Sequence, residues 1–208
     1  MSTLDIATLT AWIDAYRDAI AEHKDELTDL DRAIGDADHG SNMARGTQAA
    51  AEKLAEAPPA TVADLGKAVG MTLVSTVGGA SGPLYGTFFL RFGVGAGAVS
   101  ELDGDGLAKA FRAGLDGVLA RGKAELEDKT MVDALTPAVE ALESGGDDLV
   151  ATVSAAADAA EVGRDATVPL VARKGRASYL GDRSAGHMDP GAASTALLLR
   201  TLAQVLAA

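Results

Sequence analysis

Residues 4–20 read LDIATLTAWIDAYRDAI, and the spacing of their apolar side chains is that of a helix. Apolar residues recur mostly at steps of two to four, as on one helix face; they are Leu4, Ile6, Leu9, Trp12, Ile13, Tyr16 and Ile20. Ala and Leu dominate the whole chain, and only 4% of its residues are aromatic. This composition favours helices packed through small side chains over a β-sandwich. We therefore expect an all-α protein.

Seven further stretches carry helical patterns, which makes eight helices in all. They cover residues 41–56, 61–77, 84–98, 105–121, 131–143, 148–162 and 190–206. Thr61, Thr130 and Asp189-Pro190 are typical helix starts. The connectors 57–60 and 144–147 are short, so neighbouring helices are expected to run antiparallel. The length of 208 residues, without a repeat or a linker, predicts one domain over 1–208.

Two segments imitate nucleotide-binding motifs of other folds. Residues 84–92 are rich in aromatics and could form a strand, and Gly93, Gly95 and Ala98 after them match a dinucleotide fingerprint. That fingerprint needs alternating strands and helices, which the chain lacks, so we interpret 84–92 as a buried helix. Residues 117–123 match a phosphate-binding loop, but Ala124 stands where a hydroxyl is needed. We reject both motifs.

The charge and residue usage exclude several classes of partner. The chain has 18 Lys and Arg against 30 Asp and Glu, a net charge of −12. Such a field disfavours nucleic acid and anionic membranes as broad-surface partners, although a local basic site for one small anion stays open. There is no cysteine, and neither a signal peptide nor a membrane span is evident. We expect a cytoplasmic protein.

Polar residues and glycines gather in four segments between the expected helices: 31–42, 78–83, 122–131 and 173–191. In the first segment, Asp36 and Asp38 are two residues apart, and Asp31 can reach back to them from the preceding helix end. Three hard oxygen donors of this kind suit Mg²⁺. The alternative is an ordinary Asp/Gly turn in which His39 is a cap or a packed imidazole.

The second and fourth segments suit an anion. Residues 78–83, GGASGP, are nearly free of side chains, so backbone N–H groups can approach phosphate oxygens; a tight helix contact is the alternative. The fourth segment contains Arg173, Lys174, Arg176 and Arg183. A solvated basic loop is the alternative there, but its length is more typical of a lid or binding loop. Because no Ser-His-Asp order is identifiable, metal-assisted phosphoryl chemistry is the best enzyme class. The residues themselves indicate a helical Mg–nucleotide or Mg–phosphate binder.

At these four segments the chain closely resembles the family of nucleotide-binding L subunits (DhaL) of bacterial dihydroxyacetone kinases. The matching motifs occur in order over nearly the whole chain: Asp31 with 35–40, GDADHG; 78–84, GGASGPL; Gly122-Lys123 with 128–131, DKTM; and 174–181, KGRASYLG, through 189–192, DPGA. The resemblance implies a single-domain barrel of eight antiparallel helices, with the nucleotide site in the loops at one end.

The resemblance also implies a role for individual residues. Asp31, Asp36 and Asp38 would hold two Mg²⁺ ions that bridge the phosphates of a retained ADP. The implied nucleotide contacts are His39, Gly40, Ser41 and Asn42 at the phosphates, Ala80 and Ser81 in the small-residue loop, Gly122 and Met131 at the adenine, and Arg176, Asp189 and Gly191 closing the site. No side chain of this subunit would be a nucleophile, because catalysis would consist of positioning and charge neutralisation.

The implied activity needs partner subunits. In the family, a K subunit holds dihydroxyacetone, and a phosphoryl-carrier M subunit of the phosphoenolpyruvate-dependent system rephosphorylates ADP in place. Two alternatives stay open: an L-type subunit of an ATP-dependent kinase for another small hydroxyl substrate, and a nucleotide-bound regulatory module with a transcription regulator as partner. A homodimer is a further open question.

Overall fold

The computed structural model describes residues 3–208, and its helices confirm the expected all-α class. Residues 1 and 2, which belong to the predicted domain range, lie outside the described part. The elements are β1 (Leu4–Asp5), α1 (Ile6–Glu22), α2 (Lys24–Ile34), α3 (His39–Glu56), α4 (Val62–Thr76), α5 (Ser81–Ala96), β2 (Glu101–Leu102), α6 (Gly104–Gly122), α7 (Met131–Glu143), α8 (Leu149–Ala166), the 3₁₀ helix η1 (Arg176–Ser184) and α9 (Pro190–Ala207). Each of the eight expected helices has a counterpart.

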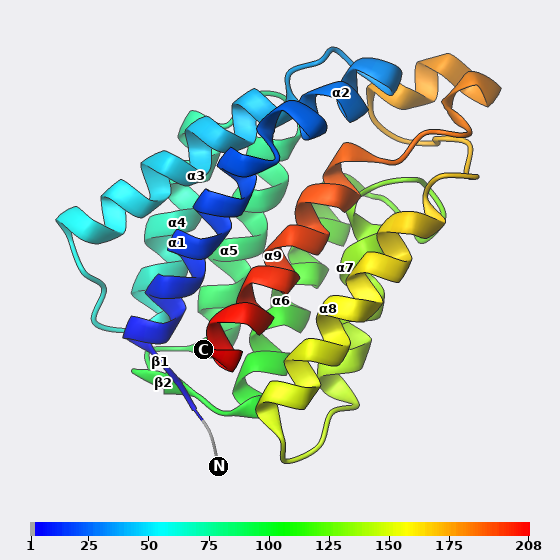
Figure 1. The fold of residues 1–208 in the computed structure, drawn as a ribbon. Coiled ribbons are helices and arrows are strands. Elements are labelled where there is room, and N and C mark those ends of the chain that lie inside the picture. Colours follow the sequence, from blue (N-terminus) through cyan, green and yellow to red (C-terminus); the bar gives the residue numbers. More distant parts are fainter. Residues whose placement is uncertain (1–2) are drawn as a thin grey trace.

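Eight of the helices form a closed ring. The packing order runs α1, α3, α4, α5, α6, α7, α8, α9 and back to α1. Chain direction alternates along this order (Figure 1). Most neighbouring helices are joined by short connections, whereas α2 lies between α1 and α3, and the long connection 167–189 joins α8 to α9. The connections 35–38, 77–80, 123–130 and 167–189 all lie at the end of the ring where α2 and η1 are found. The antiparallel ring therefore brings the four polar segments of the sequence together.

The interior of the ring is filled by the apolar face that residues 4–20 predicted, together with the aromatic segment of α5. Trp12 lies 5.9 Å from Phe89 and 5.8 Å from Phe111, measured between ring centroids. Its indole N–H donates to the carbonyl of Leu198 at 2.9 Å. This hydrogen bond joins α1 to α9, the first and last helices of the ring. Residues 84–92 thus lie in a buried helix, as the sequence interpretation held.

The α4–α5 pair packs through glycine. A Cβ added at Gly66 would lie 2.6 Å from the carbonyl oxygen of Phe89, and one at Gly70 would lie 2.7 Å from that of Gly86. Distances this short mean that the two backbones are in contact, which only a missing side chain permits. The expected packing through small faces is thus realised between α4 and α5.

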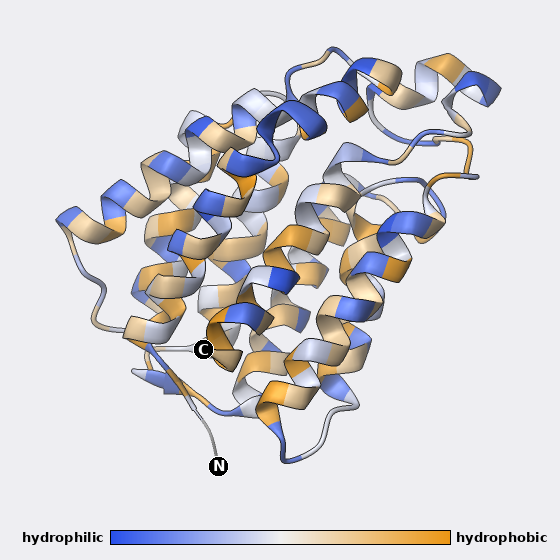
Figure 2. Ribbon diagram, viewed as in Figure 1, coloured by the Kyte–Doolittle hydropathy of each residue, from blue (hydrophilic) through white to orange (hydrophobic). Residues whose placement is uncertain are grey.

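Two helical elements were not predicted. Helix α2 is mostly hydrophilic (Figure 2), and its narrow buried stripe of Leu27, Asp31 and Ile34, although at helical spacing, was not recognised in the sequence. The expected loop 173–191 contains η1, which is interrupted at Gly181 (φ 56°). A two-residue β pair, Leu4 with Leu102 and Asp5 with Glu101, was also missed. Within the described residues, no helix has the length and apolar character that a membrane span requires.

Candidate functional site

The four polar segments surround one cavity of about 510 Å³, a volume in the usual range of small-molecule sites. Helices α3, α5, α7 and α9 all begin at its wall, with His39, Ser81, Met131 and Pro190 in the lining. The N-terminus of a helix carries unpaired N–H groups and the positive end of the helix dipole. Four such ends around one cavity suit an anionic ligand.

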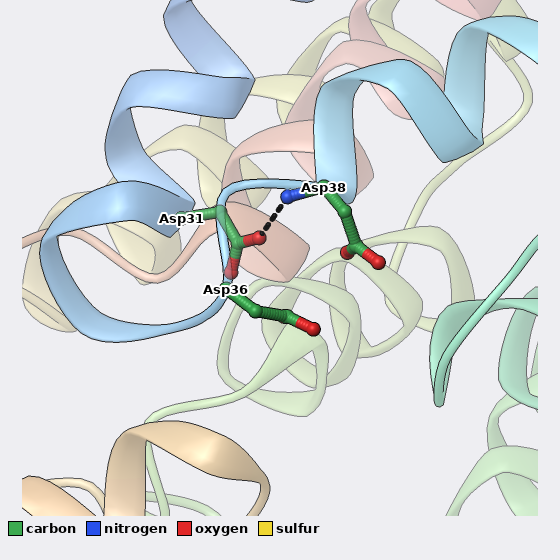
Figure 3. Close-up of side chains that lie close together, drawn as sticks. All are labelled: Asp31, Asp36 and Asp38. Carbon is green, nitrogen blue, oxygen red and sulfur yellow. Dashed lines mark hydrogen bonds between the residues drawn. The ribbon is translucent and has the colours of Figure 1, made fainter.

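Three carboxylates form the acidic wall of the cavity. One oxygen each from Asp31, Asp36 and Asp38 lies within 4.8 Å of the other two. Asp31 is buried at the end of α2, and its Oδ2 accepts the backbone N–H groups of Asp38 at 2.8 Å and His39 at 3.1 Å. The carboxylates of Asp36 and Asp38 point to the same side of the loop (Figure 3). Converging carboxylate oxygens beside open space fit Mg²⁺, which takes few protein ligands and leaves positions for water and phosphate.

The backbone of this loop is held in a special conformation. Ala37, between Asp36 and Asp38, has a backbone φ of 61°. Apart from glycine and a few polar residues, amino acids rarely adopt a positive φ. A Cβ at Gly35 would lie 2.0 Å from Oδ1 of Asp31. The loop therefore turns tightly around the Asp31 carboxylate, and strain of this kind persists where surrounding contacts fix it.

The basic side of the cavity comes from the start of η1 and the residues just before it. Arg176 Nε lies 3.0 Å from Asp36 Oδ2, and Lys174 also lines the cavity. Below η1, Ile34, Ala172 and Ala177 form a small apolar cluster with Leu180 packed against it. This cluster fixes η1 on the end of α2, so the basic segment is a folded cover beside the acidic wall.

His39 connects three helices through both ring nitrogens. Nδ1 lies 3.1 Å from Ser81 Oγ on α5, and Nε2 lies 2.9 Å from Ser194 Oγ on α9. Ser194 Oγ is also bonded to the hydroxyl of Tyr85 at 2.7 Å. Burial lowers the pKa of His39 to about 4, against an opposing effect of Asp31 and Asp38. His39 is therefore a neutral, packed imidazole, which agrees with the alternative reading of this residue.

Asp189, also in the cavity lining, is the N-cap of α9. Its Oδ2 accepts the N–H of Ala192 at 2.8 Å, and its own N–H donates to Thr167 Oγ1 at 3.0 Å. Burial raises the pKa of Asp189 to about 7, and the hydrogen bond from Ala192 opposes that shift. A Cβ added at Gly191 would lie 3.5 Å from the backbone nitrogen of Met131. The starts of α7 and α9 are thus in contact.

Most of the predicted site residues line the cavity: Asp31, Asp36, Asp38, His39, Ala80, Ser81, Gly122, Met131, Arg176, Asp189 and Gly191. Gly40, Ser41 and Asn42 are not in the lining. Gly40 packs against the carbonyl of Lys24, where a Cβ would lie 2.0 Å away, and Ser41 is exposed on α3. Asn42 accepts from Arg45 and lies against Gly78. Ligand contacts for these three stay a prediction.

The cavity also contains residues that sequence reasoning did not assign. Tyr85 and Tyr179 belong to its lining, as does Lys129, whose side chain is only 1% exposed. Lys129 stood in the third motif, but no pattern marked its side chain as buried. Tyr85 stood in the aromatic run of α5, where it could not be told from a core residue.

The DAK2 domain family matches residues 33–204. The chain belongs to this family, which is the class that its ring of helices and four-loop site define.

Relatives that match this chain over nearly their whole length show which members of the DAK2 family it resembles. The chain is 46% identical over 193 residues to PEP-dependent dihydroxyacetone kinase 1, ADP-binding subunit DhaL, of Listeria innocua, covering 93% of each chain. It is 44% identical over 204 residues to the corresponding ADP-binding subunit DhaL of Escherichia coli, covering 97% of each. Within the DAK2 family, it therefore stands with the DhaL subunits.

Solved structures agree with the fold. The chain superposes on the dihydroxyacetone kinase of C. freundii with a TM-score of 0.75 at 28% identity, covering 95% of this chain. The same kinase in complex with AMP-PNP and Mg²⁺ matches with a TM-score of 0.75 at 29% identity. This chain spans 34% of the C. freundii kinase chain, so it corresponds to one part of that protein.

Proposed function

We propose that this chain is the ADP-binding subunit of a phosphoenolpyruvate-dependent dihydroxyacetone kinase, a phosphotransferase that acts with partner subunits. The carboxylate cluster of Asp31, Asp36 and Asp38, in a cavity bordered by four helix N-termini, is the observation that carries the proposal. The DhaL relatives named for this activity match nearly their whole length, which supports it. Residues 1–208 are proposed to act as one L-type nucleotide-binding domain.

In the proposed site, Asp31, Asp36 and Asp38 hold two Mg²⁺ ions, and the phosphates of a retained ADP lie over the N-termini of α3 and α5. Bound Mg²⁺ would neutralise phosphate charge during transfer. Four positive charges on two ions exceed three negative carboxylates, so the acidic wall can accept an anionic ligand. Gly122 and Met131 border the adenine, while Arg176, Asp189 and Gly191 close the cavity.

The side chains of the site suit positioning rather than covalent catalysis. His39 is the histidine in the cavity lining, and both of its ring nitrogens are engaged, with Ser81 and Ser194. A phosphohistidine would need one of these nitrogens to be free and directed at the ligand. The helix N-termini and Arg176 can instead stabilise charge that develops on phosphate oxygens. No catalytic residue is therefore assigned to this subunit.

Phosphoryl transfer would proceed through two partner proteins. A phosphoryl-carrier M subunit transfers its phosphoryl group to the terminal phosphate of the retained ADP, which becomes ATP in place. The γ-phosphoryl group then passes to a hydroxyl of dihydroxyacetone on a K subunit. The hydroxyl proton is released and ADP is restored in the same site.

The first experiment asks what the purified protein holds. The protein is prepared without added nucleotide and denatured in acid, and the released nucleotide is identified by mass spectrometry. Near-stoichiometric ADP is expected. An empty protein that exchanges free ATP on the turnover timescale would instead favour an ATP-dependent kinase subunit. Nucleotide binding without phosphoryl transfer, when K and M subunits are supplied, would favour a regulatory module.

A matched pair of variants tests the metal cluster. Asp36→Ala should lose Mg²⁺-dependent ADP retention with unchanged helicity, because an exposed carboxylate of the cluster is removed. Asp147→Ala is the control, because Asp147 is exposed in the connector at the other end of the ring. Equal ADP retention in the two variants would contradict the site assignment.

A further inference from the structure

Lys129 is the buried cation of this protein. Of the Lys and Arg residues in 3–208, it alone falls in the buried class, with 1% of its surface exposed. It belongs to the 123–130 loop, which leads into α7, and its backbone has φ 63°. A charged side chain is buried only where partners replace its water shell, and the strained backbone at the same position needs comparable support.

Backbone carbonyl oxygens supply that replacement. Lys129 Nζ donates to Thr167 O at 2.8 Å and to Leu170 O at 3.0 Å, and it also contacts the carbonyl oxygens of Val168 and His187. All four acceptors belong to the 167–189 connection between α8 and α9. Because carbonyl oxygens only accept hydrogen bonds, this shell requires the three donors of an ammonium group. The Lys129 side chain thereby binds one cavity loop to another.

Thr167 extends this link to the start of α9. Its carbonyl accepts from Lys129, and its hydroxyl accepts the backbone N–H of Asp189 at 3.0 Å. Thr167 is fully buried. One residue thus joins the Lys129 ammonium to the N-cap of α9. On the other side, Lys129 lies two positions before Met131, the first residue of α7.

We propose that Lys129, acting through Thr167, is a positioning residue that sets the start of α9 against the start of α7 and thereby shapes the base-binding side of the cavity. The inference rests on the proposed nucleotide site, because Met131 and the Asp189–Gly191 turn are the groups that it aligns. It assigns no contact between Lys129 and the nucleotide. The metal cluster belongs to a different segment, the loop between α2 and α3, and none of the hydrogen bonds of Lys129 reaches it.

Comparing two ligands distinguishes base binding from phosphate and metal binding. Bound nucleotide is removed by dialysis against a chelator, and calorimetry then measures the affinities for Mg-ADP and for Mg-pyrophosphate, which has no base. In Lys129→Met, we expect the Mg-ADP affinity to fall by about tenfold or more and the Mg-pyrophosphate affinity to stay within about twofold. Lys129→Gln, which retains two donors, should give an intermediate loss.

Thr167 provides a second test if Lys129→Met does not fold. Thr167→Val removes the hydroxyl and leaves the Asp189 N–H without a partner, so it should also weaken Mg-ADP more than Mg-pyrophosphate. Thr167→Ser retains the hydroxyl and should bind both ligands as the unchanged protein does.

Equal losses for the two ligands in a folded variant would overturn the inference, because they would indicate general destabilisation. An unchanged Mg-ADP affinity would overturn it as well. If the unchanged protein binds Mg-pyrophosphate but not Mg-ADP, the proposed function fails, and the role of Lys129 in base binding fails with it.

Discussion

The guanidinium of Arg176 lies 3.0 Å from the carboxylate of Asp36 and connects the cover over the cavity to its acidic wall. Arg176 comes from η1, and Asp36 comes from the turn before α3. The proposed metal ions would compete with Arg176 for the same carboxylate. The basic segment and the metal cluster are therefore coupled, and this coupling can be measured.

Removing Arg176 should have opposite effects on the metal and on the nucleotide. Arg176→Ala frees Asp36, so affinity for Mn²⁺, used as a paramagnetic substitute for Mg²⁺, should rise by about two- to fivefold without nucleotide; the pair is largely exposed, which keeps the effect small. Retention of ADP should fall, because a phosphate-binding cation is lost. Arg183→Ala, also in η1, is the control. Lower Mn²⁺ affinity in Arg176→Ala would contradict competition.

Gly35 should be required for the metal cluster. In Gly35→Ala, the new Cβ would lie 2.0 Å from Asp31 Oδ1, so the carboxylate has to move away from the N–H groups of Asp38 and His39. We expect ADP retention to be lost while circular dichroism stays unchanged. Gly146→Ala is the matched control, because its Cβ would have nothing within 4 Å. A Gly35→Ala protein that retains ADP would show that Asp31 is not needed in its present position.

The sequence was sufficient for most of the ring because its helices carry strong apolar faces. Leu9, Trp12 and Tyr16 in α1, like Leu198 and Leu202 in α9, are buried positions three or four residues apart. Helix α2 escaped prediction because it lies outside the ring and buries few apolar side chains. Its apolar residues, Leu27, Leu30 and Ile34, do recur at helical spacing, but they are few among the polar residues of a short segment.

The site could be predicted as four segments but not as a set of contacts. Asp36 and Asp38 are close in sequence, so their convergence follows from local geometry. Tyr85 and Ser194, by contrast, are 109 residues apart and share a 2.7 Å hydrogen bond. No local pattern indicates such a contact, because it depends on how α5 and α9 are placed in the ring. The burial of Lys129 could not be predicted either, because its hydrogen-bond acceptors lie far away in the sequence, in the 167–189 connection.

The glycine contact between α4 and α5 predicts that a glycine-to-alanine substitution there lowers the free energy of unfolding, opposite to the usual effect within a helix. Replacing a glycine within a helix by alanine normally stabilises a protein by up to about 1 kcal/mol. In Gly70→Ala, the added Cβ would lie 2.7 Å from the carbonyl oxygen of Gly86. The helices would have to separate, so we expect a loss of about 1–3 kcal/mol in the free energy of unfolding. Urea denaturation would measure it, and a stabilised Gly70→Ala protein would disprove the close contact.

Asp189 should make the protein less stable as the pH rises from 3.8 to about 7, the interval between its pKa values in the unfolded and folded states. Its pKa is about 7 in the folded protein, against 3.8 for a free side chain. The folded state therefore binds more protons than the unfolded state between these values, and the free energy of unfolding falls with rising pH across that window. The difference between the two pKa values corresponds to a loss on the order of 4 kcal/mol in the free energy of unfolding across this window.

Asp189→Asn removes this titration and keeps a side-chain oxygen for the N-cap bond to Ala192. The difference in unfolding free energy between the Asn variant and the unchanged protein should therefore grow in favour of the variant from pH 5 to pH 8. Urea denaturation at several pH values measures that difference. Taking the difference between the two proteins cancels the titration of groups that both of them share. A difference that stays constant with pH would show that Asp189 titrates alike in the folded and unfolded chains, and the burial of its carboxylate would then carry no electrostatic cost.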